Sequence, residues 1–522
     1  MNRDDPLDSR QLLEAVQVAQ RRVLDPARPD AVARQRGDGK LTARERIALV
    51  ADPDSFAEYG ALVAPLQEAE RMRDVAAPAD GVVTGICRLD GRSAVLTSQD
   101  FTVLGGSSSK VGAQKVTRSV ELAIDRGIPL VRLLEGGGHR IQDGLDARHF
   151  APGHRMFHAF ARASGWVPVA AGMLGPCFAG PTNHAAFADF VVMVRGIATM
   201  GMAGPSLVRA GTGEEIGKEE LGGIEMQVSQ NGIADLAVDT EQECMLAIRR
   251  FLSYLPPNAR EPLPIEACDD PPGRREEALL DLVPANTRKA YDMRKVITLV
   301  ADRGSVFELK PTHAANVVTS MARLDGRPVG IIANNPMKLA GMLDANACEK
   351  AAHFVALCDA FGLPLIYLVD VPGFAIGSAA EESRMARRSA KLLQELGHAT
   401  VPRISVVLRK GYGLAYVAMC GGRSFDADAV LAWPTAEICA MSVEGAVDIA
   451  YRSEVAADPQ ARARLVSEFK RQLGALRAAE HFGVDDVIDP RDTRRRLIET
   501  LATCPARRRI EMPPKFRAIS PL

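Results

Sequence analysis

The 522-residue sequence predicts an α/β protein built from two tandem domains of the same fold. Residues 82–92 (VVTGICRLDGR) and 317–327 (VVTSMARLDGR) are identical at eight of 11 positions and lie 235 residues apart. The segments 128–138 (IPLVRLLEGGG) and 363–373 (LPLIYLVDVPG) share one pattern at the same spacing. Because two independent segments repeat at one spacing, the chain contains an internal duplication.

Each copy predicts the same order of elements. The Asp-Gly pair within RLDGR supplies the positive φ angles of a type I′ turn, so the flanking segments form a β-hairpin. Residues 112–127 carry apolar side chains at helical spacing and end in a glycine, and a buried strand follows. Residues 345–362 repeat this helix in the second copy. Such strand–helix–strand order predicts a mostly parallel or mixed sheet whose ligands bind at the loops after the strands.

A proline-rich segment separates the two copies. Residues 253–272 contain six prolines and several acids, a composition typical of an extended linker. We therefore place the first domain at residues 1–260 and the second at residues 275–522.

Two helices are predicted outside the repeated elements. Residues 10–24 form an N-terminal helix, and residues 461–483 form an amphipathic helix. The apolar stripe of the second helix consists of Leu465, Phe469, Leu473 and Leu476. Both helices are expected to be packing elements.

Composition argues against several classes of function. The 64 basic and 65 acidic residues leave no positive field that would attract nucleic acid. The N-terminus MNRDDPLDSR is too charged for a signal peptide, and the apolar stretch 167–180 is too short to span a membrane. None of the nine cysteines forms a CxxC pair, so we expect reduced thiols in a cytoplasmic protein.

Glycine-rich loops follow strands in both copies and could bring backbone N–H groups close to an anionic oxygen. In the first copy they span residues 104–110, 135–144 and 175–180, and in the second copy 371–377 and 410–416. The segments FAG (178–180) and GLA (413–415) are again 235 residues apart. Matched loops of this kind suggest two equivalent oxyanion sites, as needed to stabilise the enolate of a thioester.

The motifs of nucleophilic, metal-dependent and nucleotide-binding enzymes are not found in the sequence, which points to backbone donors and a cofactor. His154 and His158 lie four residues apart, but no third metal ligand is suggested, so no metal site is expected. Six other side chains near the loops could either act on a ligand or only brace the fold: Glu135 and Asp370 as bases, His139 and His184 as ligand contacts, and Lys110 and Arg140 as partners of phosphates.

Ten or more segments, in order, resemble the carboxyltransferase (β) subunits of the biotin-dependent propionyl-CoA and 3-methylcrotonyl-CoA carboxylases. They include GKLTARERI (39–47), SQDFTVLGGS (98–107), GPCFAGPTNHAAFADF (175–190) and AWPTAEICAM (432–441). The resemblance extends from about residue 30 to residue 522. It implies two tandem crotonase-like (ClpP/crotonase) ββα-spiral domains. It also implies transfer of CO2 from carboxybiotin to the α, or vinylogous γ, carbon of an acyl-CoA through an enolate.

The same resemblance implies which residues form the sites. The acyl-CoA binds mainly to the first domain, where Ala179 and Gly180 donate to the thioester oxygen. Biotin binds to the second domain, where Leu414 and Ala415 donate to it. Further contacts with the two ligands are expected from Gly105, Gly106, Gly136, Gly137, Gly138, His139, Gly373, Phe374, Tyr416 and Val417.

The resemblance also implies partners. The family forms hexamers built from dimers, in which the first domain of one subunit faces the second domain of its neighbour. No segment resembles the AMKM hairpin that carries biotin, and Lys338 in NPMKLA has a different context. Biotin is therefore expected on a biotin carboxylase or biotin carboxyl carrier subunit, with no nucleic-acid or membrane partner.

Four positions depart from the family pattern: His139, Gln227, Leu414 and Val417. Val417 replaces an acid at a position that the resemblance links to the choice of acyl chain, so the acyl group stays open. Two alternatives also remain open. The chain could be the carboxyltransferase subunit of a biotin-dependent acyl-CoA decarboxylase, because one site can run in both directions. It could also be a non-catalytic CoA-binding paralogue.

Overall fold

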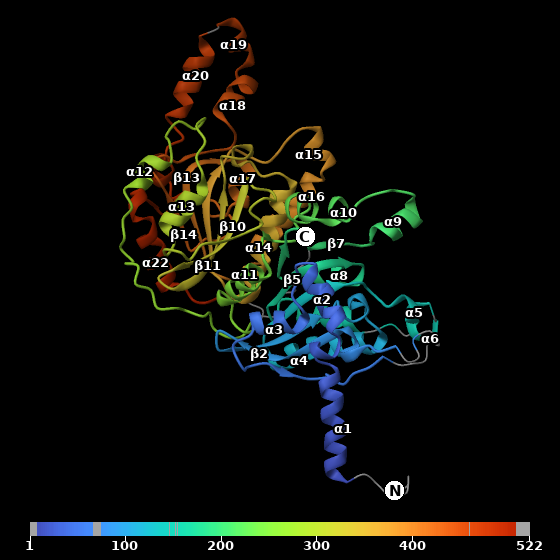
Figure 1. The fold of residues 1–522 in the computed structure, drawn as a ribbon. Coiled ribbons are helices and arrows are strands. Elements are labelled where there is room, and N and C mark those ends of the chain that lie inside the picture. The colour runs from blue at the N-terminus through green and yellow to red at the C-terminus, as the bar shows by residue number, and fades with distance from the viewer. Residues whose placement is uncertain are drawn as a thin grey trace. The chain divides into compact units, whose positions relative to one another are not determined.

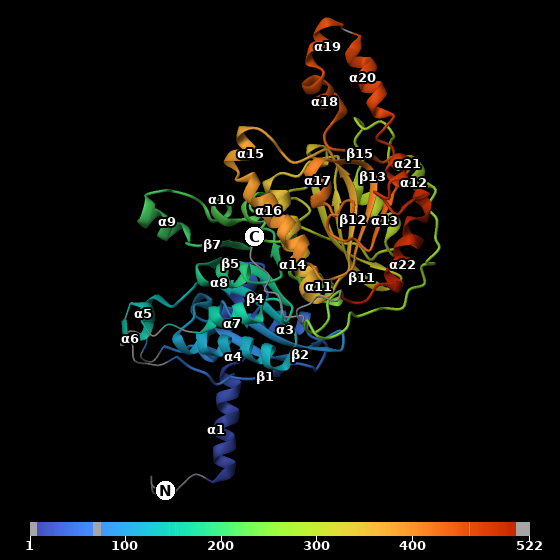
Figure 2. The same ribbon diagram turned by 180° about the vertical axis from the view of Figure 1, so that it is seen from behind.

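The computed structural model describes residues 8–65, 72, 75–145, 147–151, 153, 155–458 and 460–507. The side chain of His149 and all of His154 lie outside this description, and with them the suggested histidine pair. The chain divides into two compact units, Met1–Ser253 and Tyr254–Leu522 (Figures 1 and 2). The proline-rich segment belongs to the second unit, where Arg323 donates to the Pro264 carbonyl at 2.8 Å.

The first unit contains one eight-stranded mixed sheet with the order β1-β2-β3-β4-β5-β6-β8, and β7 pairs with β5. The first three strands are antiparallel, and the others run parallel from β3 onward. The strands are β1 (Ala57–Glu58), β2 (Val82–Leu89), β3 (Arg92–Gln99), β4 (Leu130–Gly136), β5 (Val169–Phe178), β6 (Phe190–Val194), β7 (Thr199–Gly201) and β8 (Leu236–Val238).

The second unit repeats this sheet strand for strand. Its order is β16-β14-β13-β12-β11-β10-β9, and β15 pairs with β13 as β7 pairs with β5. The strands are β9 (Phe307–Leu309), β10 (Val317–Leu324), β11 (Arg327–Asn334), β12 (Leu365–Val371), β13 (Arg403–Tyr412), β14 (Ala429–Ala432), β15 (Glu437–Cys439) and β16 (Asp486–Val487). The predicted duplication of a mixed α/β sheet is therefore confirmed.

Helices cover the sheet of each unit. The first unit contains α1 (Ser9–Arg22), α2 (Pro29–Gly37), α3 (Ala43–Val50), α4 (Lys110–Arg126), α5 (Ile141–Gly144), α6 (Ala147–Phe150), α7 (Met156–Ala163), α8 (Gly180–Ala186), α9 (Pro205–Thr212), α10 (Lys218–Gly222) and α11 (Glu241–Ser253). The second contains α12 (Ala278–Leu282), α13 (Met293–Val300), α14 (Ala345–Phe361), α15 (Ser378–Glu382), α16 (Met385–His398), α17 (Gly413–Ala418), α18 (Val443–Ala450), α19 (Arg452–Ala457), α20 (Ala461–Lys470), α21 (Ala475–Glu480) and α22 (Thr493–Thr503).

The predicted crossover helices form as α4 and α14. Each ends at a glycine in the left-handed conformation, Gly127 with φ 60° and Gly362 with φ 82°. A glycine adopts this conformation without the steric cost that a Cβ would bring, which explains why both helices end there. The N-terminal helix also forms, as α1, but it buries none of its residues within this chain, so the expected packing role is not seen.

The predicted helix over residues 461–483 is wrong as a single element. It forms two short helices, α20 and α21, because Gly474 is extended (ψ 158°) and bridges Glu437. Leu465 packs with Val443 and Val447 of α18, whereas Leu476 lies beyond the break and is 73% exposed. Helices α18, α19 and α20 form an arm that stands away from the sheet of this unit (Figures 1 and 2).

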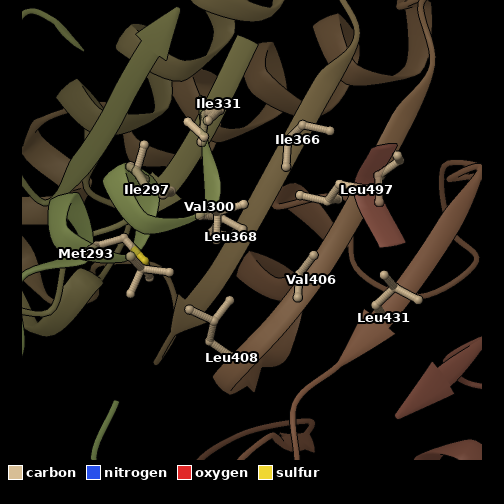
Figure 3. Close-up of a cluster of buried hydrophobic side chains, with 14 of the residues drawn as sticks. Met293, Ile297, Val300, Ile331, Ile366, Leu368, Val406, Leu408, Leu431 and Leu497 are labelled. Atoms are coloured by element: carbon tan, nitrogen blue, oxygen red, sulfur yellow. The ribbon is translucent and has the colours of Figure 1, made fainter. Parts of the chain in front are cut away.

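The hydrophobic core of the second unit shows how a helix closes one face of its sheet. Met293, Ile297 and Val300 of α13 lie over the strands in Figure 3. Alternate residues of two neighbouring strands point to this same face: Ile366 and Leu368 on β12, and Val406 and Leu408 on β13. This period of two is the one expected of a strand with one side against a helix.

The RLDGR turns have the predicted type I′ geometry. The φ angles are 50° and 78° at Asp90–Gly91 and 52° and 74° at Asp325–Gly326. A carboxylate holds each turn: Asp52 accepts both N–H groups of the first at 3.0 and 2.8 Å, and Asp302 accepts those of the second at 2.9 and 2.8 Å. The carboxylate replaces the water that would otherwise bond these donors.

The duplication extends further than the sequence prediction. The segments 44–56 (RERIALVADPDSF) and 294–306 (RKVITLVADRGSV) occupy equivalent places before their hairpins, 250 residues apart. Each begins with an arginine that forms a two-pronged ion pair with a strand glutamate, Arg44 with Glu58 and Arg294 with Glu308. These segments lie 250 residues apart and not 235, so they do not align when the two copies are matched at the spacing of the hairpins.

A buried lysine ties the crossover helix to the start of the hairpin in both copies. Lys115 donates to the carbonyls of Ala79 at 3.3 Å and Val82 at 2.6 Å. Lys350 donates to the equivalent carbonyl of Val317 at 2.7 Å and to three more carbonyls. Each lysine thereby satisfies buried backbone oxygens where the chain enters the sheet.

Among the described residues, no helix is both long and apolar enough to cross a bilayer. The same part of the chain contains no cluster of three or more His, Cys, Asp and Glu that could hold a metal ion. All nine cysteines are free thiols. Burial raises the pKa of several of them, for example that of Cys177 to about 12, so these thiols stay protonated at neutral pH.

We predict that Lys115→Met changes how stability depends on pH. Burial lowers the pKa of Lys115 to about 8, whereas an unfolded lysine has a pKa near about 10.4. Between these values the unfolded chain binds more protons, so the contribution of Lys115 to stability becomes less unfavourable as pH rises. From about pH 7 to about pH 10, the free energy of unfolding of the wild type should rise by about 2 kcal/mol relative to the variant.

Urea unfolding of the two proteins at several pH values measures this difference. The exposed Lys218 provides the control, because Lys218→Met should leave the pH dependence unchanged. A difference that stays constant with pH would show that the pKa of Lys115 is not lowered.

Candidate active site

A buried carboxylate lies near the end of β4, the central strand in the sheet order of the first unit. Glu135 on β4 is fully buried and binds two cations, Lys40 at 2.8 Å and Arg46 at 2.5 Å. Gln35 donates to the same carboxylate at 2.8 Å. The cations come from α3 and the residues before it, so the segment GKLTARERI is what neutralises this charge.

The second unit has the same carboxylate but a different set of cations. Asp370 on β12 is fully buried and pairs with Arg409 at 2.9 Å and Lys410 at 3.3 Å, both on the adjacent strand β13. The residue equivalent to Lys410 in the first unit is Gly175, and a Cβ there would lie 2.5 Å from the Glu135 carboxylate. Since both acids are enclosed by cations, the geometry fits the bracing role and not that of a base.

The turn after β5 carries the first pair of predicted backbone donors. Ala179 has φ 62° and ψ −126°, a conformation that non-glycine residues rarely adopt. Its N–H donates to the carbonyl of Gly201 on β7 at 2.8 Å, so this donor is already engaged. The N–H of Gly180 has no acceptor among the described residues, and a Cβ at Gly180 would meet no atom within 4 Å.

The neighbouring glycine loop packs against this turn. A Cβ on Gly138 would lie 3.2 Å from the Ala179 Cβ and 3.5 Å from the Gly180 nitrogen. The carbonyl of Gly138 accepts the N–H of Ser108 at 3.1 Å, whereas its own N–H finds no acceptor in the described part of the chain. Gly138 and Gly180 therefore place two unoccupied backbone donors side by side.

The other glycines of this region shape the loops. Gly137 donates to the carbonyl of Gly105, which has φ 63°, at 3.1 Å. A Cβ on Gly106 would lie 2.4 Å from the Glu135 carbonyl oxygen, and one on Gly136 would lie 2.7 Å from the Gly106 oxygen. Only glycine allows this close approach, so Gly106 and Gly136 are required for the two loops to pack.

The polar side chains near the first turn have mostly structural surroundings. Arg140 is buried and donates to Asp80 at 2.9 Å, which favours bracing over contact with a phosphate. His139 is half-buried and its ring covers Gly144, where a Cβ would lie 2.9 Å from the imidazole. His184 is buried beside Phe160.

Gln227, which departs from the family pattern, supports the strand that holds the first turn. Its side-chain amide donates to the Met200 carbonyl at 2.9 Å, and Asn231 donates to the Gln227 side-chain oxygen at 3.0 Å. Met200 precedes Gly201, the residue that accepts the Ala179 N–H. This role could not be predicted from the sequence, because β7 is only three residues long and its partners lie far away in the chain.

The equivalent turn of the second unit follows β13. Gly413 has φ 64°, and a Cβ there would approach the Ala440 carbonyl to 3.0 Å. The N–H groups of Leu414 and Ala415 have no acceptor within the described ranges. The Leu414 side chain is 57% exposed, whereas Ala415 is buried. Both predicted donors of this turn are therefore unoccupied.

The remaining predicted residues of the second unit surround this turn or its neighbouring loop. Leu343 donates to the carbonyl of Gly373 at 3.1 Å and forms a bridge with Phe374. This bridge repeats that between Ser108 and His139 in the first unit. Tyr416 packs its ring where a Cβ on Gly411 would lie, at 2.9 Å, and Val417 is half-buried on α17.

Known proteins share this arrangement over nearly the whole chain. Residues 34–519 match the carboxyl transferase domain. The propionyl-CoA carboxylase beta chain of Roseobacter denitrificans is 39% identical, over 94% of this chain and 95% of the relative. The methylmalonyl-CoA decarboxylase subunit alpha of Veillonella parvula is also 39% identical, over 93% and 94%. The methylmalonyl-CoA carboxyltransferase 12S subunit of Propionibacterium freudenreichii subsp. shermanii is 41% identical, over 90% of each.

A solved structure shows the same fold. One chain of the transcarboxylase 12S crystal structure, which has methylmalonyl-coenzyme A and methylmalonic acid bound, superimposes with a TM-score of 0.92 at 38% identity, over 99% of this chain and 100% of that one. The predicted pair of tandem crotonase-like domains is thereby confirmed. By its sequence, its duplicated sheets and its matched turns, the chain belongs to the carboxyl transferase family that includes the β chains of biotin-dependent acyl-CoA carboxylases.

Proposed function

We propose that this chain is the carboxyltransferase subunit of a biotin-dependent acyl-CoA carboxylase. It transfers CO2 from carboxybiotin to the α, or vinylogous γ, carbon of an acyl-CoA through an enolate. The observation that carries this proposal is the pair of equivalent turns after β5 and β13, each with backbone N–H groups that have no acceptor in the described part of the chain. Preorganised donors of this kind stabilise negative charge on an oxygen without reorganisation.

The first turn supports binding of the thioester oxygen. Because the N–H of Ala179 is engaged by Gly201, we assign the two donors to Gly180 and Gly138, whose positions adjoin. Ala179 then acts by its positive φ angle, which turns the chain so that the next N–H faces outward. As the α proton leaves, charge grows on the thioester oxygen and these two hydrogen bonds strengthen.

The second turn supports binding of the ureido oxygen of biotin. Carboxybiotin, carried on a biotin carboxylase or biotin carboxyl carrier subunit, supplies the CO2. Leu414 and Ala415 donate to the ureido oxygen, and their free N–H groups and the exposed Leu414 side chain fit a ligand that approaches from solvent. Gly373, Phe374, Tyr416 and Val417 shape the surface around it.

The relatives support a proposal for the assembly and the location of this chain. The transcarboxylase 12S structure is described as a hexamer with substrate bound. We extend to this chain a hexamer built from dimers, an acyl-CoA bound by residues of the loops at 105–106 and 136–139, and a cytoplasmic location.

The reverse direction is a second candidate. The relative from Veillonella parvula is a methylmalonyl-CoA decarboxylase subunit, and its identity of 39% equals that of the propionyl-CoA carboxylase chain. The same donors serve both directions, because the enolate is common to carboxylation and decarboxylation. The partner protein, and not this chain, decides between them.

We predict that the purified chain transfers a carboxyl group between CoA esters and free biotin. Malonyl-CoA and methylmalonyl-CoA serve as donors, and the measured quantity is the rate at which each loses its carboxyl group in the presence and absence of biotin. A biotin-dependent rate with at least one ester is expected. If no ester reacts even with a biotinylated partner subunit, the chain is the non-catalytic CoA-binding paralogue.

We predict that Gly180→Pro lowers kcat by roughly 100- to 1,000-fold, since it removes one oxyanion donor. Proline suits the first position of a helix, whereas at Ala179 its fixed φ would disrupt a turn that needs 62°. Gly180→Ala is the matched control, because it keeps the N–H and its Cβ enters open space. Equal activity of both variants would remove Gly180 from the mechanism, and thermal unfolding with size-exclusion chromatography verifies that each variant folds and assembles.

We predict that Leu414→Pro impairs transfer to and from biotin but not binding of the CoA ester. The exposed Leu414 side chain contributes little packing, so Leu414→Ala, which keeps the N–H, should retain most activity. Isothermal titration measures affinity for the CoA ester, and the transfer assay measures turnover. A variant that loses CoA affinity, or one that transfers at the wild-type rate, would contradict the assignment of this turn to biotin.

A further inference from the structure

Four of the largest fully buried side chains are arginines, and one of them differs from the rest. Arg46 pairs with Glu135 at 2.5 Å, Arg409 with Asp370 at 2.9 Å, and Arg494 with Asp302 at 2.6 Å. Arg132, on β4, has no carboxylate within 4 Å in the described part of the chain. A buried cation without a counter-ion is unfavourable by several kcal/mol.

Neutral groups compensate Arg132 only weakly. Its Nε lies 3.4 Å from the hydroxyl oxygen of Thr97, a long hydrogen bond, and its guanidinium lies 4.9 Å from the centre of the Phe160 ring. Its Nη1 is buried and has no hydrogen-bond partner among the described residues. Burial lowers the pKa of Arg132 to about 9, so the side chain is still charged at neutral pH.

Arg132 lies on the face of the sheet that carries the proposed thioester site. The Phe160 ring, on α7, contacts both Arg132 and His184, and its centre lies 5.3 Å from that of the imidazole. His184 belongs to α8, the helix that begins at Gly180. His184 also meets Phe157 of α7, which is 38% exposed, with the ring centres 5.3 Å apart. A series of ring contacts thus connects the exposed Phe157 of α7, through His184 and Phe160, with the guanidinium of Arg132.

We propose that Arg132 is a specificity-determining residue that binds a carboxylate at the far end of the acyl group. This inference rests on the proposed function, because it assumes that the thioester is bound at Gly138 and Gly180. A dicarboxylic acyl chain that enters between α7 and α8 brings the missing negative charge to Arg132 while the aromatic rings contact its methylene groups. An alkyl chain of the same length leaves the cation unpaired, so it binds less well.

The duplication provides an internal comparison. The residue equivalent to Arg132 on β12 is Tyr367, also fully buried, at the centre of the second sheet. A neutral phenol needs no counter-ion, so the duplicated strand folds without a charge at this position. The duplicated strand therefore does not share the charge at residue 132, as expected if that charge serves recognition and not the fold.

The test compares glutaryl-CoA with valeryl-CoA, which have the same chain length and differ in the terminal group. The wild type should have a kcat/KM for glutaryl-CoA that is roughly tenfold or more above that for valeryl-CoA, as expected for one hydrogen-bonded charge pair. Arg132→Met should abolish this preference through loss with glutaryl-CoA alone. Arg132→Lys keeps the charge and should retain part of it, and Tyr367→Phe, the matched control in the second unit, should leave it unchanged.

Equilibrium binding separates this inference from the proposed function. If no ester is turned over, the proposed function fails, but tighter binding of glutaryl-CoA that Arg132→Met removes still supports the role of Arg132. Equal kcat/KM values of the wild type for the two esters, or a preference that Arg132→Met retains, would overturn the inference. A third result would also overturn the inference. If phosphate or chloride stabilised the wild type as much as glutaryl-CoA does, and did not stabilise Arg132→Met, the site would be one for inorganic anions.

Discussion

Each unit depends on the ion pairs of one buried carboxylate, which lies near the end of the central strand of its sheet. Glu135 and Asp370 lie where the glycine loops leave the sheet, and both are fully buried, so each requires cations at hydrogen-bonding distance. Removal of one partner from such a pair typically costs about 3–5 kcal/mol, because the remaining charge is left in the protein interior. The ion pairs at the strand ends therefore hold the loops that carry the donors. The donors themselves have no acceptor in the described part of the chain and can bind a ligand.

The first turn shows how a backbone can keep a donor available. Ala179 is held at a positive φ by the bond from its N–H to Gly201, and Gln227 supports the adjoining residue of the same strand. These contacts use one N–H and leave the next, at Gly180, without an acceptor in the described part of the chain. A strained residue that other contacts over-determine is common at functional sites, where the strain is part of the preorganisation.

Much of the architecture could be predicted from the sequence, because the relevant patterns are local. The hairpins follow from Asp-Gly at 90–91 and 325–326, and the crossover helices from apolar spacing that ends in a glycine. What could not be predicted depends on distant partners: the engagement of Ala179 by β7, the cations of Glu135, and the break at Gly474 where the chain bridges another strand. The surroundings of Arg132 could not be predicted either, because a single cation within an apolar strand does not indicate whether the fold places a carboxylate beside it.

The two units differ in which part of the chain supplies the cations that pair with the buried acid. The second unit neutralises its acid with neighbours from the adjacent strand, so every group of that cluster lies within the repeated element itself. The first unit has Gly175 in place of the corresponding lysine and pairs its acid with Lys40 and Arg46, which precede its hairpin. Removal of the segment with Lys40 and Arg46 would thus leave Glu135 buried without these two cations, whereas Asp370 would keep its own. Substitutions at Lys40 or Arg46 therefore act on the interior of the amino-terminal half, although both residues precede its hairpin.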